Sequence, residues 1–149
     1  MKTTIVTHNA QQTRAFGSYL ATLLSGGELI FLDGVLGSGK TTFTQGLALG
    51  LGIEGPVSSP TFTLMKEYQG RHWLIHIDAY RLEGIDQDLG FEDYLDGESI
   101  VIIEWAKFIE HHLEKPTIQI LIEYQQNDER LIHIEASPTL IKEIESYVS

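Results

Sequence analysis

Residues 29–43 read LIFLDGVLGSGKTTF, and the rest of the chain can be placed relative to them. The apolar run from Leu29 to Leu32 predicts a buried strand that ends at a glycine-rich loop. Beyond the loop, TTFTQGLALGLG predicts a helix that ends near Gly50 or Gly52. The stretch therefore predicts the order strand, glycine-rich loop, helix.

The loop itself, Gly34 to Thr41, reads GVLGSGKT and matches the pattern G-x-x-x-x-G-K-[ST] in full. In this pattern the glycines allow backbone N–H groups to turn inward around phosphates, and the helix N-terminus adds partial positive charge. Lys40 would neutralise the β- and γ-phosphates, and the Thr41 hydroxyl would bind Mg²⁺. The alternative is a glycine-rich turn without a ligand, which the flanking strand and helix disfavour.

A loop of this kind needs an acidic partner for the metal at the end of another buried strand. Asp78 follows the apolar run HWLIHI, and Glu104 follows SIVII. Asp78 could hold the water shell of the metal or orient the attacking water, and Glu104 could bind the metal directly or through a water. Either acid could instead be only a solvated strand end. The sequence does not assign these roles. It contains no N-K-x-D motif, with which GTPases usually recognise guanine, so we expect ATP to be the nucleotide.

The remaining pattern predicts one α/β domain over residues 1–149. Strands are expected at 3–7, 28–33, 61–68, 72–78, 99–105, 117–124 and 130–136, and helices at 9–25, 41–52, 106–113 and 137–148, with short helices in 79–97. The last two strands would form a C-terminal β-hairpin. Strands that alternate with helices indicate a P-loop NTPase-like three-layer sandwich with a mixed central sheet.

The net charge of −11 argues against direct nucleic-acid binding. Ten basic residues against 21 acidic ones produce a field that repels DNA and RNA. The chain contains no cysteine, which excludes disulfides and sulfur-based zinc sites. Neither a signal-peptide pattern nor a run of about 20 apolar residues is present, so we expect a soluble, cytoplasmic protein.

Four further stretches accompany the loop in a specific order and spacing. They are SSPTFTLMKEY (58–68), HIDAYRLEG (76–84), LGFEDYL (89–95) and IIEWAK (102–107). With these motifs the chain closely resembles the bacterial TsaE family, formerly called YjeE, over nearly its whole length. The resemblance implies an ATP- and Mg²⁺-binding ATPase of tRNA threonylcarbamoyladenosine synthesis. Such a protein acts with TsaB and TsaD on adenosine 37 of tRNAs that read codons beginning with A.

The same resemblance implies how the subunit works. ATP hydrolysis would be slow for the subunit alone and faster with its partners, and it would reset the complex between catalytic cycles. The tRNA would be contacted only indirectly, through the complex, which agrees with the acidic balance of this chain.

The resemblance also implies site residues by position. The residues around the triphosphate would be Gly37, Ser38, Gly39, Lys40, Thr41 and Thr42, with Thr41 and Glu104 as Mg²⁺ ligands. Asp78 would take part in ATP hydrolysis, and Thr61 would lie in a loop that senses the γ-phosphate.

Two further nucleotide contacts are implied at the ends of the chain. Thr13 would lie near the adenine, although THNAQQT (7–13) lacks the acid commonly found before that threonine. Arg130, in the loosely matching NDER, would contact the nucleotide. Trp105 would lie near the site or at the partner surface.

Several residues admit a second interpretation. His72, His76 and Asp78 are close in sequence, but without cysteine or a further ligand a zinc site is disfavoured. We expect His76 instead to be a hydrogen-bonding residue beside Asp78. Arg81 could act as an arginine finger or form an ordinary salt bridge with the acidic residues that follow it.

Three functions are therefore weighed. The first is a regulatory ATPase in a tRNA-modifying assembly, the second a small-molecule kinase, and the third a nucleotide-dependent binding module without useful turnover. Kinases of this size usually carry an arginine-bearing lid, and the ten basic residues contain no arginine cluster. Hydrolysis that depends on partners would distinguish the first from the third.

Overall fold

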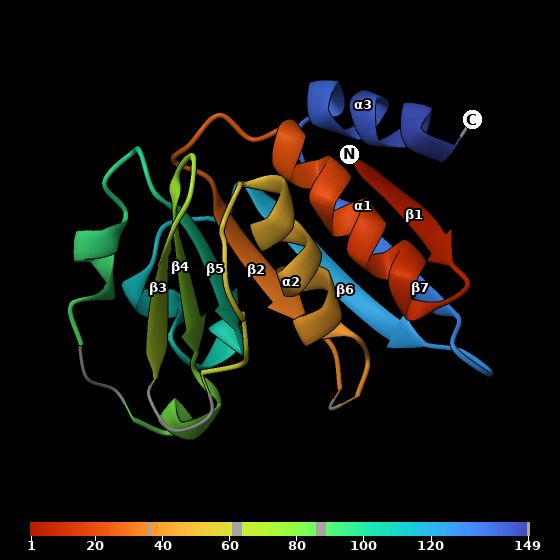
Figure 1. The fold of residues 1–149 in the computed structure, drawn as a ribbon. Helices are drawn as coiled ribbons and strands as arrows, with labels where there is room; N and C mark the ends of the chain where they lie inside the picture. The colour runs from red at the N-terminus through yellow and green to blue at the C-terminus, as the bar shows by residue number, and fades with distance from the viewer. Residues whose placement is uncertain (36, 61–63, 86–88, 149) are drawn as a thin grey trace.

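A seven-stranded sheet with the order β1-β7-β6-β2-β5-β4-β3 forms the centre of the chain in the computed structural model (Figure 1). The structure describes residues 1–35, 37–60, 64–85 and 89–148. The strands are β1 (Lys2–Thr7), β2 (Leu29–Asp33), β3 (Met65–Gln69), β4 (Trp73–Asp78), β5 (Ile100–Glu104), β6 (Ile118–Tyr124) and β7 (Arg130–Glu135). The four strands β6, β2, β5 and β4 run parallel, while β1, β7 and β3 pair antiparallel with their neighbours. The predicted mixed sheet and C-terminal hairpin are confirmed.

All three α-helices cover one face of this sheet (Figure 1). They are α1 (Ala10–Thr22), α2 (Lys40–Gly50) and α3 (Pro138–Val148). Asn9 caps α1, because its side chain accepts a hydrogen bond from the N–H of Gln12 at 2.8 Å. The helix ends earlier than the expected residue 25, since the N–H of Leu23 bonds back to Leu20 O and tightens the last turn.

Helices α1 and α2 cross so closely that their contact requires glycine. A Cβ atom on Gly46 would lie 2.0 Å from the carbonyl oxygen of Arg14, and one on Gly17 would lie 2.5 Å from Phe43 O. A Cβ atom on Gly50 would meet Ser18 O at 2.4 Å. This close approach packs α2 against α1, and the two helices share a core with Phe16, Leu20, Phe43 and Leu47.

Short 3₁₀ turns cover part of the opposite face of the sheet. They are η1 (Tyr80–Leu82), η2 (Phe91–Tyr94), η3 (Ala106–Phe108) and η4 (Glu110–His112). They pack on a second core that includes Phe31, Ile77 and Ile103. The three-layer class is thus confirmed, but the helix predicted over 106–113 is wrong. Trp105 has a left-handed φ of 59° and Ile109 a φ of −133°, so neither has α-helical dihedrals.

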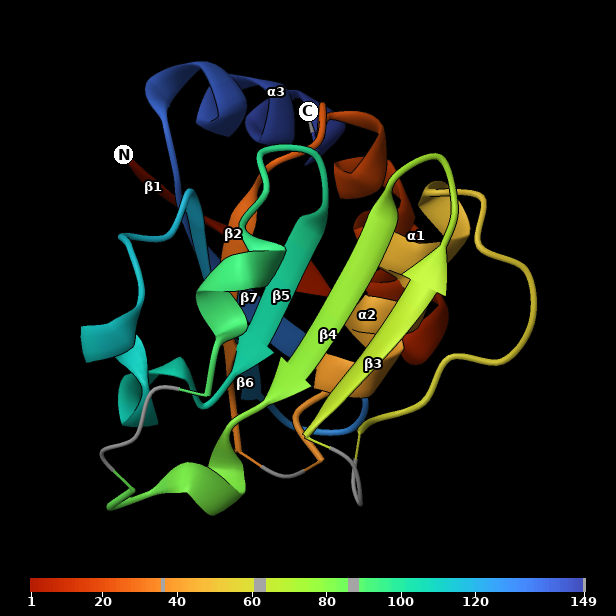
Figure 2. The ribbon, with the colours of Figure 1, turned by 90° about the vertical axis from the view of Figure 1, so that its left-hand side faces the viewer.

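The parallel strands bring the candidate residues to one edge of the sheet. Figure 2 shows β4 and β5 ending on the side where the loop after β2 lies. Asp78 pairs with Glu104, and Glu104 pairs with Leu32, two residues before the glycine-rich loop. The strand predicted from residue 61 is described from Met65 onward, and residues 61–63 lie outside the described part. Within the described residues, no helix is long and apolar enough to cross a membrane.

Candidate phosphate-binding site

The loop between β2 and α2 has the backbone that its glycines allow. Gly39 is the residue before α2 and takes a left-handed φ of 109°, which L-residues with a side chain rarely adopt. It therefore offers no side chain to bind the N–H groups of the first turn of α2. The Ser38 hydroxyl is buried inside the loop and makes no hydrogen bond to any described residue. A loop with open N–H groups and a free hydroxyl fits an anion.

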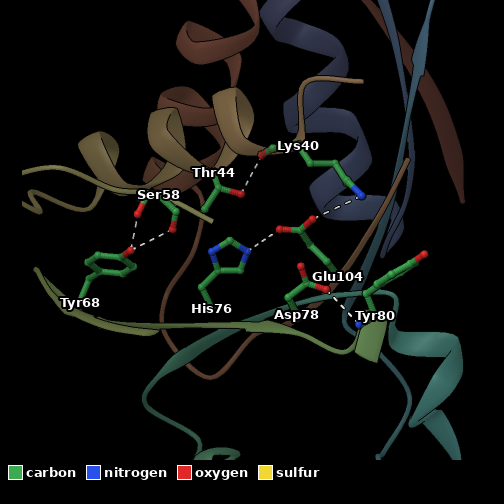
Figure 3. A network of polar contacts seen from close by, with 8 residues as sticks. All are labelled: Lys40, Thr44, Ser58, Tyr68, His76, Asp78, Tyr80 and Glu104. Atoms are coloured by element: carbon green, nitrogen blue, oxygen red, sulfur yellow. Dashed lines mark hydrogen bonds and ion pairs between the residues drawn. The ribbon is translucent and has the colours of Figure 1, made fainter. Parts of the chain in front are cut away.

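Lys40, Glu104 and His76 form a buried chain of contacts beside this loop (Figure 3). Lys40 Nζ lies 3.4 Å from Glu104 Oε1, and His76 Nε2 lies 2.6 Å from Glu104 Oε2. The exposed fraction is 4% for Glu104 and 1% for His76. Burial alone raises the pKa of Glu104, but the hydrogen bond from His76 and the attraction of His76 and Lys40 together hold it below its usual value. Glu104 is therefore a carboxylate at neutral pH.

This lowered pKa predicts an acid-sensitive contribution to stability. Because the pKa of Glu104 is lower in the folded chain, ionised Glu104 stabilises the fold above pH 4.5, and this stabilisation is lost as the pH falls through the folded pKa. We expect the free energy of unfolding of the wild type, relative to Glu104→Gln, to be larger at about pH 7 than at about pH 3. Urea denaturation of both proteins at both pH values measures this difference, with Glu92→Gln as an exposed control. A difference that stays constant with pH would contradict the assignment.

Asp78 lies next to Glu104 at the end of β4. Residues paired across parallel strands point to the same face, so both carboxylates face α2. Asp78 is half-buried, and its Oδ1 accepts a hydrogen bond from the N–H of Tyr80 at 3.0 Å. The expectation that His76 is a hydrogen-bonding residue is confirmed, but its partner is Glu104 and not Asp78. The register pairs His76 with Ile102 and Asp78 with Glu104, so Glu104 is the diagonal neighbour of His76 on the adjacent strand, within reach of a long side chain.

Trp105 lies directly beside the lysine. Its ring centre is 5.1 Å from Lys40 Nζ, and its ring stacks on Phe108 and meets the edge of Tyr80. Lys107 lies over the same ring at 5.2 Å. The expectation that Trp105 is near the site thus agrees with the contacts. Its left-handed backbone directs the chain into η3 and leaves the ring against Lys40.

Arg130 contacts the loop through the backbone. Its Nε donates to Ser38 O at 2.7 Å and its Nη2 to Gly37 O at 3.4 Å, while its guanidinium lies 4.7 Å from the centre of the Tyr124 ring. Arg130 therefore holds two loop carbonyls in place. In this way the hairpin β6–β7 supports the glycine-rich loop.

The four other predicted site residues are threonines. Thr13 is buried, and its hydroxyl lies 2.6 Å from that of Thr7 at the end of β1. Thr41 and Thr42 are half-buried in the first turn of α2. Thr61 lies outside the described residues. Ser58, which precedes it, is held by Tyr68, whose hydroxyl donates to Ser58 O at 3.2 Å.

The metal hypotheses can be compared with this geometry. Among the described residues, no group of three His, Cys, Asp or Glu side chains is arranged to hold a metal ion. His72 lies just before β4, at the opposite end of that strand from Asp78. The oxygen donors that the site does offer are the Thr41 hydroxyl and the carboxylates of Glu104 and Asp78. These donors fit Mg²⁺, which keeps several waters and takes few protein ligands.

Comparison with known proteins agrees with this arrangement. The family model described as Threonylcarbamoyl adenosine biosynthesis protein TsaE matches residues 7–132. The chain belongs to the TsaE family. The resemblance seen in the motifs is thus confirmed.

Two curated relatives carry the name tRNA threonylcarbamoyladenosine biosynthesis protein TsaE. That of Bacillus subtilis (strain 168) is 44% identical over 127 residues, which cover 85% of this chain and 80% of the relative. That of Treponema pallidum (strain Nichols) is 37% identical over 131 residues, 87% of this chain and 97% of the relative. The crystal structure of Bacillus subtilis YdiB superposes with a TM-score of 0.84 at 34% identity, covering 100% of this chain and 97% of that one.

Two contacts of this TsaE family member could not be found from its motifs. The His76–Glu104 hydrogen bond joins residues 28 positions apart and depends on the β4–β5 register. The alternation along β4 puts His76 and Asp78 on one face, and this is the signal that the sequence offers. The packing of Arg130 on Tyr124 depends likewise on the pairing of β6 with β7.

Proposed function

We propose that this chain is an ATP-binding, Mg²⁺-dependent ATPase subunit, formed by a single P-loop domain over residues 1–149, that is required for threonylcarbamoyladenosine modification of tRNA. It acts with TsaB and TsaD at position 37 of tRNAs that read codons beginning with A, and its ATP hydrolysis resets their complex. The observation that carries the proposal is the contact of Lys40, at the start of α2, with the buried carboxylate of Glu104. The names of the TsaE relatives supply the tRNA modification.

The loop would hold the triphosphate with residues that the fold already positions. The holding residues would be Gly37, Ser38, Gly39, Lys40, Thr41 and Thr42, with backbone N–H groups, the lysine ammonium and two hydroxyls as donors. Lys40 lies at the N-terminus of α2, so its charge and the helix dipole act on the same anion. When it donates to phosphate oxygens, Lys40 exchanges part of its contact with Glu104 for a contact with ATP.

Thr41 and Glu104 would hold Mg²⁺. Bound Mg²⁺ would supply positive charge that stabilises the transferring phosphoryl group. Glu104 suits this role because its carboxylate is ionised, buried and directed at the loop by two contacts. Thr41 suits it because its position in the pattern places the hydroxyl at the first turn of α2.

Asp78 would orient the attacking water, and other residues would report the nucleotide. Asp78 lies beside Glu104 and is half-buried, so its carboxylate is in contact with solvent. The hydrogen bond that it accepts from the Tyr80 N–H fixes its orientation. Thr61 would sense the γ-phosphate. Thr13 would lie near the adenine. Arg130, which already donates a hydrogen bond to the backbone carbonyl of Ser38 in the loop, would contact the nucleotide there.

The proposed cellular setting follows from charge and partners. A net charge of −11 opposes retention of tRNA by the isolated chain, so the tRNA would be contacted through TsaB and TsaD. Because tRNA is modified before translation, we propose that the protein works in the cytoplasm.

Substitution of Asp78 by asparagine tests the hydrolytic role. Asparagine keeps the size of the side chain but cannot accept a proton from water, so kcat should fall about tenfold to a hundredfold while the Kd for ATP changes by less than about threefold. Steady-state phosphate release gives kcat, and calorimetry with a non-hydrolysable ATP analogue gives Kd. Asp93→Asn, an exposed acid in η2, serves as the control. Equal losses of binding and turnover would assign Asp78 a structural role instead.

A further inference from the structure

His76 is buried at the centre of the site and makes one polar contact with the residues that the structure describes. Its exposed fraction is 1%, and its Nε2 lies 2.6 Å from Glu104 Oε2. The other oxygen of the same carboxylate, Oε1, lies 3.4 Å from Lys40 Nζ (Figure 3). The two oxygens of Glu104 are therefore divided between two partners. One is tied to β4 and the other is directed at the glycine-rich loop.

The second ring nitrogen of His76 adds no polar contact within the described part of the chain. His76 Nδ1 is buried and has no hydrogen-bond partner among the described residues. Because an ionised carboxylate only accepts hydrogen bonds, Nε2 must carry the hydrogen that is shared with Glu104. An unpaired buried nitrogen costs free energy that an apolar side chain would avoid, and the neighbouring Leu74 on the same face of β4 is apolar. What histidine contributes here is therefore its hydrogen bond to Glu104.

We propose that His76 is a positioning residue that holds Glu104 Oε2 and thereby keeps Oε1 directed at the phosphate-binding loop. The inference rests on the proposed function, in which Glu104 serves the metal. Without His76, the Glu104 carboxylate can rotate and offer both oxygens to Lys40, which strengthens a contact that must yield when ATP binds. Loss of such an outer partner typically lowers metal affinity or activity by about tenfold to a hundredfold.

Three substitutions separate positioning from packing. His76→Gln places an amide N–H₂ near the position of Nε2 and can still donate to Glu104. His76→Asn reaches only as far as Nδ1, and His76→Leu fills the space without a donor. We expect the leucine and asparagine variants to lose at least about tenfold in kcat and in affinity for Mg²⁺, and the glutamine variant to recover most of both. Mg²⁺ affinity is measured by calorimetry on the protein saturated with a non-hydrolysable ATP analogue, independently of turnover.

A double-mutant cycle with Glu104→Gln completes the test. If His76 acts through Glu104, His76→Leu should have little further effect on Mg²⁺ affinity once Glu104 is glutamine. Additive losses, or equal losses in the glutamine and leucine variants, would overturn the proposal. If the leucine variant does not fold, the comparison of glutamine with asparagine decides in the same way. If Glu104→Gln alone leaves Mg²⁺ affinity and hydrolysis unchanged, the proposed function fails. If Glu104→Gln lowers both but His76→Leu changes neither, only the positioning role of His76 is refuted.

Discussion

Replacing Lys40 by alanine is expected to weaken ATP binding by at least about a hundredfold. The ammonium of Lys40 would donate charge-assisted hydrogen bonds to two phosphate groups, and each such bond is worth about 1.5 to 3 kcal/mol. The side chain is largely buried, with 10% of it exposed, so water cannot replace it fully. Calorimetric titration with a non-hydrolysable ATP analogue and Mg²⁺ measures the change, and circular dichroism checks that the variant is folded.

Lys107 provides a matched control for this experiment. Its Nζ lies 5.2 Å from the Trp105 ring centre, almost as close as Lys40 at 5.1 Å, but Lys107 is exposed in η3. Lys107→Ala removes the same charge over the same ring and should leave the Kd for ATP within about twofold. If Lys40→Ala bound ATP as tightly as the wild type, the loop would not be the phosphate-binding site.

Replacing Gly46 by alanine is expected to destabilise the fold by about 3 kcal/mol or more. In an open helix this change would stabilise by about 1 kcal/mol, because alanine has the higher helix propensity. Here the new Cβ atom would lie 2.0 Å from Arg14 O, so α1 and α2 must separate and lose their shared core contacts. The free energy of unfolding from urea denaturation measures the effect.

The control for this packing prediction lies on the outer side of the same helix. Leu49 is 60% exposed, so Leu49→Ala removes more atoms than the glycine substitution adds but should change the free energy of unfolding by less than about 1 kcal/mol. An unchanged or increased stability of Gly46→Ala would mean that the two helices do not approach as closely as described.

Much of the fold follows from local sequence patterns. The strand, the loop from Gly34 to Thr41 and helix α2 are predictable because the motif and the apolar periodicity act between neighbouring residues. The cap at Asn9 is local in the same way. The helix expected over 106–113 is wrong because Trp105 takes a left-handed backbone, and its ring packs on Lys40 and Tyr80, which are distant in sequence. Such tertiary packing overrides helix propensity.

The site was predictable as a set of residues but not as a set of contacts. Lys40, Asp78 and Glu104 follow from a motif and two acid-terminated apolar runs. Their arrangement depends on the strand order, which places β5 between β2 and β4 and puts Asp78 opposite Glu104. The tie from His76 to Glu104 requires that register, so no local pattern reveals it.

The steady-state rate of ATP hydrolysis by the purified chain, alone and with TsaB and TsaD added, tests the proposed function most directly. We predict a slow rate for the chain alone that rises several-fold with both partners, and loss of both rates in Lys40→Ala. Tight ATP binding without hydrolysis, even with both partners present, would indicate a nucleotide-dependent binding module. A rate that does not respond to TsaB and TsaD would contradict the proposed ATPase that is controlled by its partners.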